Sequence, residues 1–277
     1  MLKQRIITAV ILIGALIAAL WFLNPFQLSL VFGGLVLLGA WEWANLSSLT
    51  TLPARLAYTA LMALFLLGAG WLVGLPDEVS PDVIEIVCRA AFLWWLVAIA
   101  LIKTYPRNIL FWQPSPIKML FGLLVLLPPW MAGAYLLYLP NGVLWLLLSI
   151  LVVVLADVGA YFSGKAFGKN KLEVEVSPGK TWEGLLGGIL VNFILALVLI
   201  FVANLGIAPG WILIMVMLPA GFSVVGDLFE SMLKRQRGIK DSGTILPGHG
   251  GILDRIDGLT VAIPLFALIV LYSGVYG

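Results

Sequence analysis

Nine apolar runs, each long enough to cross a lipid bilayer, divide this chain and limit its fold. A bilayer core of about 30 Å takes roughly 20 apolar residues in helical form. Only 11% of the 277 residues are charged, which leaves too little polar surface for a water-soluble domain. We predict an all-α, polytopic membrane protein with about nine transmembrane helices, near residues 6–23, 26–45, 54–75, 84–102, 119–139, 142–162, 183–205, 209–229 and 256–275.

The first apolar run begins after Lys3 and Arg5, as a signal peptide would. It is longer than a usual signal-peptide core and no clear A-x-A cleavage site follows it, so we interpret it as a retained first helix. Cys88 is the one cysteine, which excludes an intrachain disulfide and a cysteine-rich metal site.

The basic residues predict the orientation of the chain. If the N-terminus is cytoplasmic, fifteen of the sixteen lysines and arginines fall on the cytoplasmic side, and Arg89 is the exception. The opposite loop, 76–85, holds four acids and no basic residue. This positive-inside pattern predicts a cytoplasmic N-terminus and places the 163–182 and 230–255 loops at the cytoplasmic face.

We interpret residues 1–277 as a single integral membrane domain with two unlike parts. Residues 1–150 are mainly scaffold helices with few ionisable groups, of which Glu42, near a cytoplasmic helix end, is the main exception. Residues 151–277 hold the polar segments and are predicted to be the catalytic half.

Carboxylates recur near the cytoplasmic ends of three predicted spans. Asp227 and Glu230 share a helical face, as do Asp254 and Asp257 one span later, and Asp157 lies at a similar depth. Several buried acids repel one another, and Mg²⁺ bound by a few carboxylates and substrate phosphates would relieve that repulsion. The pattern predicts a Mg²⁺ site, with room for a second metal ion. The alternative is that these acids form structural ion pairs with Arg235, Arg255 or Lys240.

Lysines and glycines alternate between residues 163 and 183, where Lys165 and Lys180 stand among three glycines. Glycine lets backbone N–H groups approach an anion, and lysine neutralises it. Ser177, Lys180 and Thr181 precede a predicted helix, a favourable anion position. Val174 stands where a P-loop needs its first glycine, so that motif is excluded. For any single lysine, setting the topology is the simpler explanation.

The stretch 231–257 holds eight of the thirty charged side chains, including Lys234, Arg235, Lys240 and Arg255. His249, the only histidine, stands between glycines, where it could meet a phosphate or a metal or could hold the turn. This stretch resembles the signature of the phosphatidate cytidylyltransferase (CDP-diacylglycerol synthase) family, S-x-x-K-R, four residues, K-D, then P-G-H-G-G-x-x-D-R-x-D. Residues 157–165 and 177–184 resemble family segments as well, so the likeness covers roughly 150–258.

The resemblance implies an enzyme, a nucleotidyltransferase of phospholipid biosynthesis that uses Mg²⁺ to make CDP-diacylglycerol and pyrophosphate from CTP and phosphatidate. It implies a bacterial-type cytoplasmic (inner) membrane, a cytoplasm-facing active site, a homodimer and no nucleic-acid partner. On this reading Asp227, Asp254, Asp257 and Asp157 bind metal, and the catalytic residues are Asp227, Asp254, Asp257, Lys240 and Arg255. The substrate-binding set is Ser177, Lys180, Thr181, Lys234, Arg235, His249 and Lys165.

Two other functions stay open. A CTP-dependent kinase of a polyprenol-type lipid would use similar metal chemistry. An anionic-solute transporter would place ionisable groups near the middle of the membrane, whereas here they gather at one face. A CDP-alcohol phosphotransferase is excluded, because Val261 and Ala262 replace the Ala-Arg of its motif after Asp257–Gly258.

Overall fold

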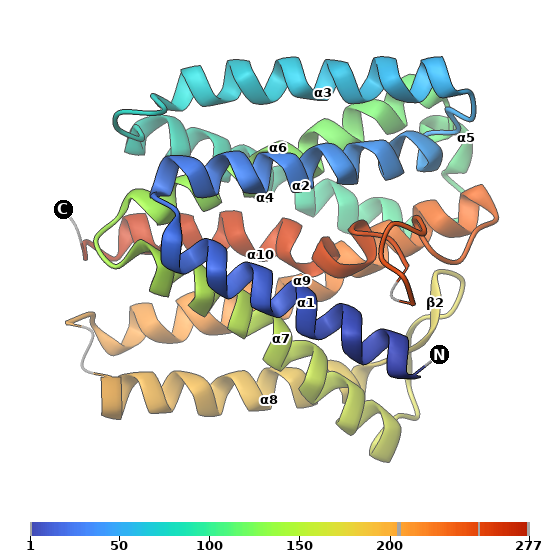
Figure 1. The fold of residues 1–277 in the computed structure, drawn as a ribbon. Coiled ribbons are helices and arrows are strands. Elements are labelled where there is room, and N and C mark those ends of the chain that lie inside the picture. The colour runs from blue at the N-terminus through green and yellow to red at the C-terminus, as the bar shows by residue number, and fades with distance from the viewer. Residues whose placement is uncertain (1, 204–205, 249, 276–277) are drawn as a thin grey trace.

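The computed structural model describes residues 2–203, 206–248 and 250–275. Nearly all of this chain is helical, and the long helices run side by side in one bundle (Figure 1). The elements are α1 (Leu2–Phe22), α2 (Pro25–Leu46), α3 (Leu52–Val73), α4 (Pro81–Thr104), α5 (Ile109–Trp112), α6 (Ser115–Tyr138), α7 (Gly142–Phe167), β1 (Lys171–Glu173), β2 (Ser177–Thr181), α8 (Trp182–Val198), the π-helix η1 (Leu199–Ala203), α9 (Pro209–Arg237) and α10 (Leu253–Tyr272).

The predicted all-α membrane fold is confirmed. In the described part of the chain, eight helices are long and apolar enough to cross a membrane: α2, α3, α4, α6, α7, α8 with η1, α9 and α10. The first predicted run is also a helix, α1, of 21 residues. Because α1 begins and α10 ends at opposite ends of the bundle (Figure 1), the arrangement fits an odd number of crossings. The count of nine and the orientation remain predictions.

One boundary differs from the sequence prediction in a way that matters for the site. Helix α9 continues past residue 229 to Arg237, where Gly238 ends it in a left-handed conformation with φ of 73°. Basic residues in the last turn stabilise the negative end of the helix dipole, and glycine at φ > 0 is a common helix stop. The prediction of a loop from residue 230 is therefore wrong as far as Arg237, and Ser231, Lys234 and Arg235 lie on a helix.

A short hairpin between α7 and α8 is a second difference from the sequence prediction. Strands β1 and β2 pair antiparallel, with Lys171 opposite Thr181. The hairpin is fastened to two helices: Glu173 forms an ion pair with Lys103 of α4, and Arg235 of α9 donates to the backbone oxygen of Val176 at 3.1 Å. These contacts fix the hairpin at the end of the bundle.

Close packing holds the second half of the chain together. Helix α7 packs most extensively on α8, and α9 on α10. Glycines allow the approach of α7 and α8, because a Cβ at Gly188 would lie 2.5 Å from the backbone oxygen of Ala156. Between α4 and α9, aromatic side chains fill the core, where Trp94 and Trp95 of α4 pack against Phe229 of α9.

Candidate active site

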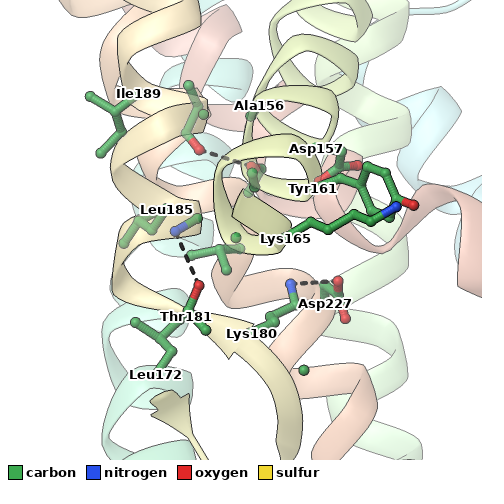
Figure 2. Close-up of a pocket in the computed structure, with 18 residues that line it drawn as sticks. Ala156, Asp157, Tyr161, Lys165, Leu172, Lys180, Thr181, Leu185, Ile189 and Asp227 are labelled. Atoms are coloured by element: carbon green, nitrogen blue, oxygen red, sulfur yellow. Dashed lines mark hydrogen bonds and ion pairs between the residues drawn. The ribbon is translucent and has the colours of Figure 1, made fainter. Parts of the chain in front are cut away.

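A cavity of about 490 Å³ lies between α7, α8, α9 and the hairpin. Figure 2 shows the polar side chains that line it from three elements: Asp157 and Lys165 on α7, Lys180 and Thr181 on the hairpin, and Asp227 on α9. The structure therefore brings five of the predicted site residues to one place. Apolar side chains complete the lining, among them Leu172, Leu185 and Ile189.

Lys180 and Asp227 form the central contact of this cavity. Their Nζ and Oδ2 atoms are 2.5 Å apart, and both side chains remain partly exposed, at 22% and 34%. Ser231, one turn further along α9, donates to the other oxygen of Asp227 at 3.2 Å. On the opposite side, the hydroxyl oxygen of Thr181 caps α8 by accepting from the N–H of Gly184 at 3.1 Å, which fixes the end of the strand that carries Lys180.

Two further carboxylates surround this pair. Asp157 of α7 interacts electrostatically with Lys180 and Asp227, and Asp257 of α10 interacts with the same two side chains. Three acids from three helices therefore interact with Lys180 or with one another, and Asp257 also interacts with Lys234 of α9. Lys165 takes a different direction, because its Nζ lies over the ring of Tyr161 at 5.9 Å from the centroid (Figure 2).

A separate buried ion-pair group links α9 to α10. Lys234 contacts Glu230 at 3.1 Å and Asp254 at 2.6 Å, and only 9% of Lys234 is exposed. The other oxygen of Asp254 accepts three hydrogen bonds of 2.9 Å, from the N–H and hydroxyl of Ser242 and the N–H of Gly251. These contacts favour a structural role for Lys234 and Asp254. The ion-pair alternative expected such a role for Asp254, but with Arg235, Arg255 or Lys240 as its partner and not Lys234. Phosphate binding by Lys234 and metal binding by Asp254 remain predictions.

A second cavity of about 700 Å³ lies in the loop that joins α9 to α10. Gly248 and Gly250 have positive φ values of 78° and 81°, which lets the loop turn sharply. His249 lies outside the described residues, so the structure does not address its role. Two predicted site residues, Lys240 and Arg255, line this second cavity. The other lining residues are Asp241, Gly243, Thr244, Leu246, Pro247, Gly248 and Gly250.

The remaining predicted residues belong to the hairpin and its support. Ser177 opens β2 three residues before Lys180. Arg235 supports the same hairpin through the Val176 oxygen. The structure thus offers Arg235 a positioning role, while its predicted contact with substrate is untested.

Glu42 was given no role from sequence, and Glu230 was grouped with Asp227 in the acidic pattern but not placed among the site residues. Glu230 is buried beside Lys234, and its i, i+4 spacing from that lysine is a signal that could have paired them. Glu42 is buried in α2 and accepts hydrogen bonds from the start of α10. Its position between two tryptophans made it unusual in sequence, but nothing local pointed to a partner about 210 residues away.

The carboxylate oxygens of Asp157, Asp227 and Asp257 are the type of ligand that a hard divalent cation prefers. Mg²⁺ commonly takes one or two protein carboxylates and completes its shell with water and substrate phosphates. Asp157 and Asp227 offer such oxygens in the cavity that also holds Lys180, and Asp257 interacts electrostatically with Asp227. Within the described residues, no three His, Cys, Asp or Glu side chains converge on a single metal position.

Comparison with known proteins gives one consistent family. A family-wide sequence profile described as "Cytidylyltransferase family" matches residues 3–273. The phosphatidate cytidylyltransferase of Pseudomonas aeruginosa is 42% identical over 281 residues, covering 99% of this chain and 98% of that protein. The Haemophilus influenzae phosphatidate cytidylyltransferase is 39% identical over 289 residues, with 96% and 98% covered. That of Bacillus subtilis is 45% identical over 133 residues, 48% of this chain. The chain belongs to the cytidylyltransferase family.

Proposed function

We propose that this chain transfers the cytidylyl group of CTP to phosphatidate, giving CDP-diacylglycerol and pyrophosphate in phospholipid biosynthesis. The observation that carries the proposal is the Lys180–Asp227 pair, which lies with Asp157 in a cavity among membrane-spanning helices. A lysine and carboxylates at this depth suit phosphate chemistry next to lipid. The relatives that match almost the whole chain carry the name of this activity.

The cavity is suited to a substrate that is half lipid. One wall is polar, while Leu185 and Ile189 of α8 contribute an apolar wall. In the same turns of α8, Leu186 and Leu190 are 61% and 60% exposed, and in a bilayer they face acyl chains. A lipid phosphate can therefore reach Lys180 while its acyl chains remain in the membrane.

The reaction requires positioning and charge neutralisation more than proton transfer. A phosphate oxygen of phosphatidate attacks the α-phosphorus of CTP, the bond from that phosphorus to the bridging oxygen breaks, and pyrophosphate leaves with the bonding electrons. Phosphatidate is already an anion, so the attack needs no general base. Lys180 holds a phosphate oxygen and offsets the charge that builds up as the two anions meet.

The carboxylates have a complementary role. Asp227 and Asp257, with Asp157 beside them, are the residues that would hold Mg²⁺, which when bound supplies positive charge to the phosphates of CTP. Asp227 also orients Lys180 before substrate arrives. Lys240 and Arg255, in the loop cavity, would bind the phosphates of CTP.

The cellular setting is also part of the proposal. CTP is found in the cytoplasm, and the excess of basic residues on one side of the predicted spans supports a site that faces it from a bacterial-type inner membrane. The hairpin and the α9–α10 loop lie at the same end of the bundle (Figure 1), so both would face that compartment. The homodimer implied by the family resemblance stays a prediction.

The test follows two phosphorus atoms of CTP. Purified protein in detergent receives phosphatidate, Mg²⁺ and CTP labelled at either the α- or the γ-phosphate. Cytidylyl transfer places the α-label in lipid and the γ-label in pyrophosphate. In a parallel reaction with a polyprenol in place of phosphatidate, a lipid kinase would instead transfer the γ-label to the polyprenol hydroxyl and release CDP, and this result would overturn the proposal.

A transporter would incorporate neither label. It would move an anionic solute across proteoliposomes without any change in CTP. Absence of both labels from lipid, with protein shown to be folded and lipid shown to be accessible, would therefore also contradict the proposal.

A further inference from the structure

Glu42 of α2 is almost completely buried, at 1% exposure, yet it carries a carboxylate. Its Oε1 accepts from the N–H of Ile252 at 3.1 Å, and its Oε2 accepts from the N–H of Leu253 at 3.0 Å. These two N–H groups open α10, where helix donors lack partners in the preceding turn. Ile252 itself has no polar side chain with which to cap the helix. Glu42 therefore caps α10 from another helix.

The loop before α10 is built around this carboxylate. The hydroxyl of Ser242 lies 3.1 Å from Glu42 Oε2 and 2.9 Å from Asp254 Oδ2, so its single hydrogen can be donated to either acid. Gly243 and Gly251 flank Glu42 so closely that a Cβ at either would lie under 3.0 Å from its side chain. A negative charge at a helix N-terminus is favoured by the helix dipole, which offsets part of the cost of burying Glu42.

The start of α10 also carries two acids that are linked to α9 and to the candidate active site. It carries Asp254, which holds Lys234, and Asp257, which interacts with Asp227 and Lys180. Gly226 of α9 lies so close to the backbone of Asp257 that no side chain would fit there. The start of α10 is therefore held between Glu42 on one side and α9 on the other.

From this geometry we infer that Glu42 is a positioning residue of the active site, supplied by the half of the chain that otherwise acts as scaffold. By capping α10 it sets the placement of Asp257 against Asp227 and Lys180. The inference rests on the proposed cytidylyl transfer only for its effect on turnover. Its structural part, the cap itself, can be tested separately.

The experiment compares Glu42→Gln with Glu85→Gln. The first substitution keeps the shape of the side chain, but the new amide nitrogen cannot accept a hydrogen bond, so one of the two N–H groups loses its partner. Glu85, at the far end of α4, is a matched control because its carboxylate also makes a salt bridge and accepts a hydrogen bond. Two readouts are taken on purified full-length protein: kcat and KM for cytidylyl transfer, and hydrogen exchange along the chain.

We expect Glu42→Gln to lower kcat by about 10- to 100-fold, the usual effect of a displacement near 1 Å in a catalytic group. Exchange should rise at residues 252–257 and stay unchanged in α3 and α4. Glu85→Gln should alter neither kcat nor exchange at 252–257. A purely structural defect would raise exchange throughout the bundle, and that outcome would overturn the inference, as would unchanged kcat or unchanged exchange at 252–257.

A second variant covers the case in which Glu42→Gln does not fold. Ser242→Ala leaves Glu42 and its bonds to the two N–H groups of α10 in place, and removes the hydroxyl that contacts both Glu42 and Asp254. It should raise exchange at 252–257 and lower kcat by a smaller factor, and no change in either would contradict the inference. If wild-type protein shows no cytidylyl transfer, the proposed function fails, while the exchange data still decide whether Glu42 caps α10.

Discussion

Lys180 of β2 and Asp227 of α9 form a 2.5 Å ion pair that joins the hairpin to a membrane-spanning helix. The hairpin follows α7 in sequence, and α8 and η1 separate it from α9, so the pair joins distant parts of the chain in the lining of the cavity (Figure 2). Both side chains stay partly exposed, which leaves them accessible to a phosphate. The pair is therefore the first place at which substitution should separate activity from stability.

Replacing Lys180 should remove most of the activity without unfolding the protein. In Lys180→Met, Asp157, Asp227 and Asp257 lose the cation that they share, and substrate phosphates lose their nearest positive charge. We expect kcat/KM to fall about 100- to 1,000-fold, the range seen when one preorganised charge-stabilising group is lost. Lys169→Met, an exposed lysine of the neighbouring loop, should retain near-normal rates. Equal losses in the two variants would show that overall loop charge, and not the pair, is what counts.

Asp227 and Asp254 should respond differently to the same substitution. Asp227→Asn should abolish turnover and leave the thermal inactivation midpoint in detergent close to that of wild type, because Asp227 is partly exposed. Asp254→Asn should lower the midpoint, because Asp254 holds buried Lys234 and three loop donors. Leaving buried donors or a buried charge without a partner costs about 1–3 kcal/mol. Lost turnover in Asp254→Asn with an unchanged midpoint would instead indicate direct metal or substrate binding.

The spans were predictable because bilayer thickness fixes the length of an apolar run, and each predicted run contains a helix in the structure. The end of α9 was not predicted correctly, because residues 230–237 are mostly polar and a polar stretch after an apolar run is typical of a loop. The i, i+4 spacing of Glu230 and Lys234 is a helical signal, but hydropathy alone does not detect it. The hairpin was missed because three- and five-residue strands leave too short a pattern to recognise.

Within the site, sequence identified the residue types but not their partners. The family resemblance grouped Asp254 with Asp227 as metal ligands, whereas the structure pairs Asp254 with Lys234 and Asp227 with Lys180. Which acid meets which base depends on how three helices rotate against one another, and no local pattern encodes that. The contact of Glu42 with α10 is of the same kind, since it is made only when α2 packs against the end of the loop.

Orientation can be measured with single cysteines in a Cys88→Ser background. Cys88 is fully buried, and serine is close to cysteine in size, so Cys88→Ser removes the native thiol with little change in packing. The positive-inside pattern predicts that Lys169→Cys faces the cytoplasm and Glu78→Cys the opposite side. A membrane-impermeant maleimide added to intact cells with a permeabilised outer membrane should label only the cysteine at position 78. Labelling at position 169 alone would reverse the orientation and move the proposed site away from CTP.

The close approach of α7 and α8 should make Gly188 intolerant of even one methyl group. A Cβ there would lie 2.5 Å from the backbone oxygen of Ala156, and backbone cannot move aside as a flexible side chain can. Gly188→Ala must therefore push the two helices apart, at a cost of about 1–3 kcal/mol. Both residues line the cavity, so kcat should fall together with the thermal inactivation midpoint. Gly68→Ala in α3, where nothing lies within 4 Å of the added Cβ, is the matched control. It should leave kcat unchanged and raise stability slightly, because alanine is the better helix former by about 1 kcal/mol. A Gly188→Ala protein as stable and active as the Gly68→Ala control would show that α7 and α8 are not packed through this contact.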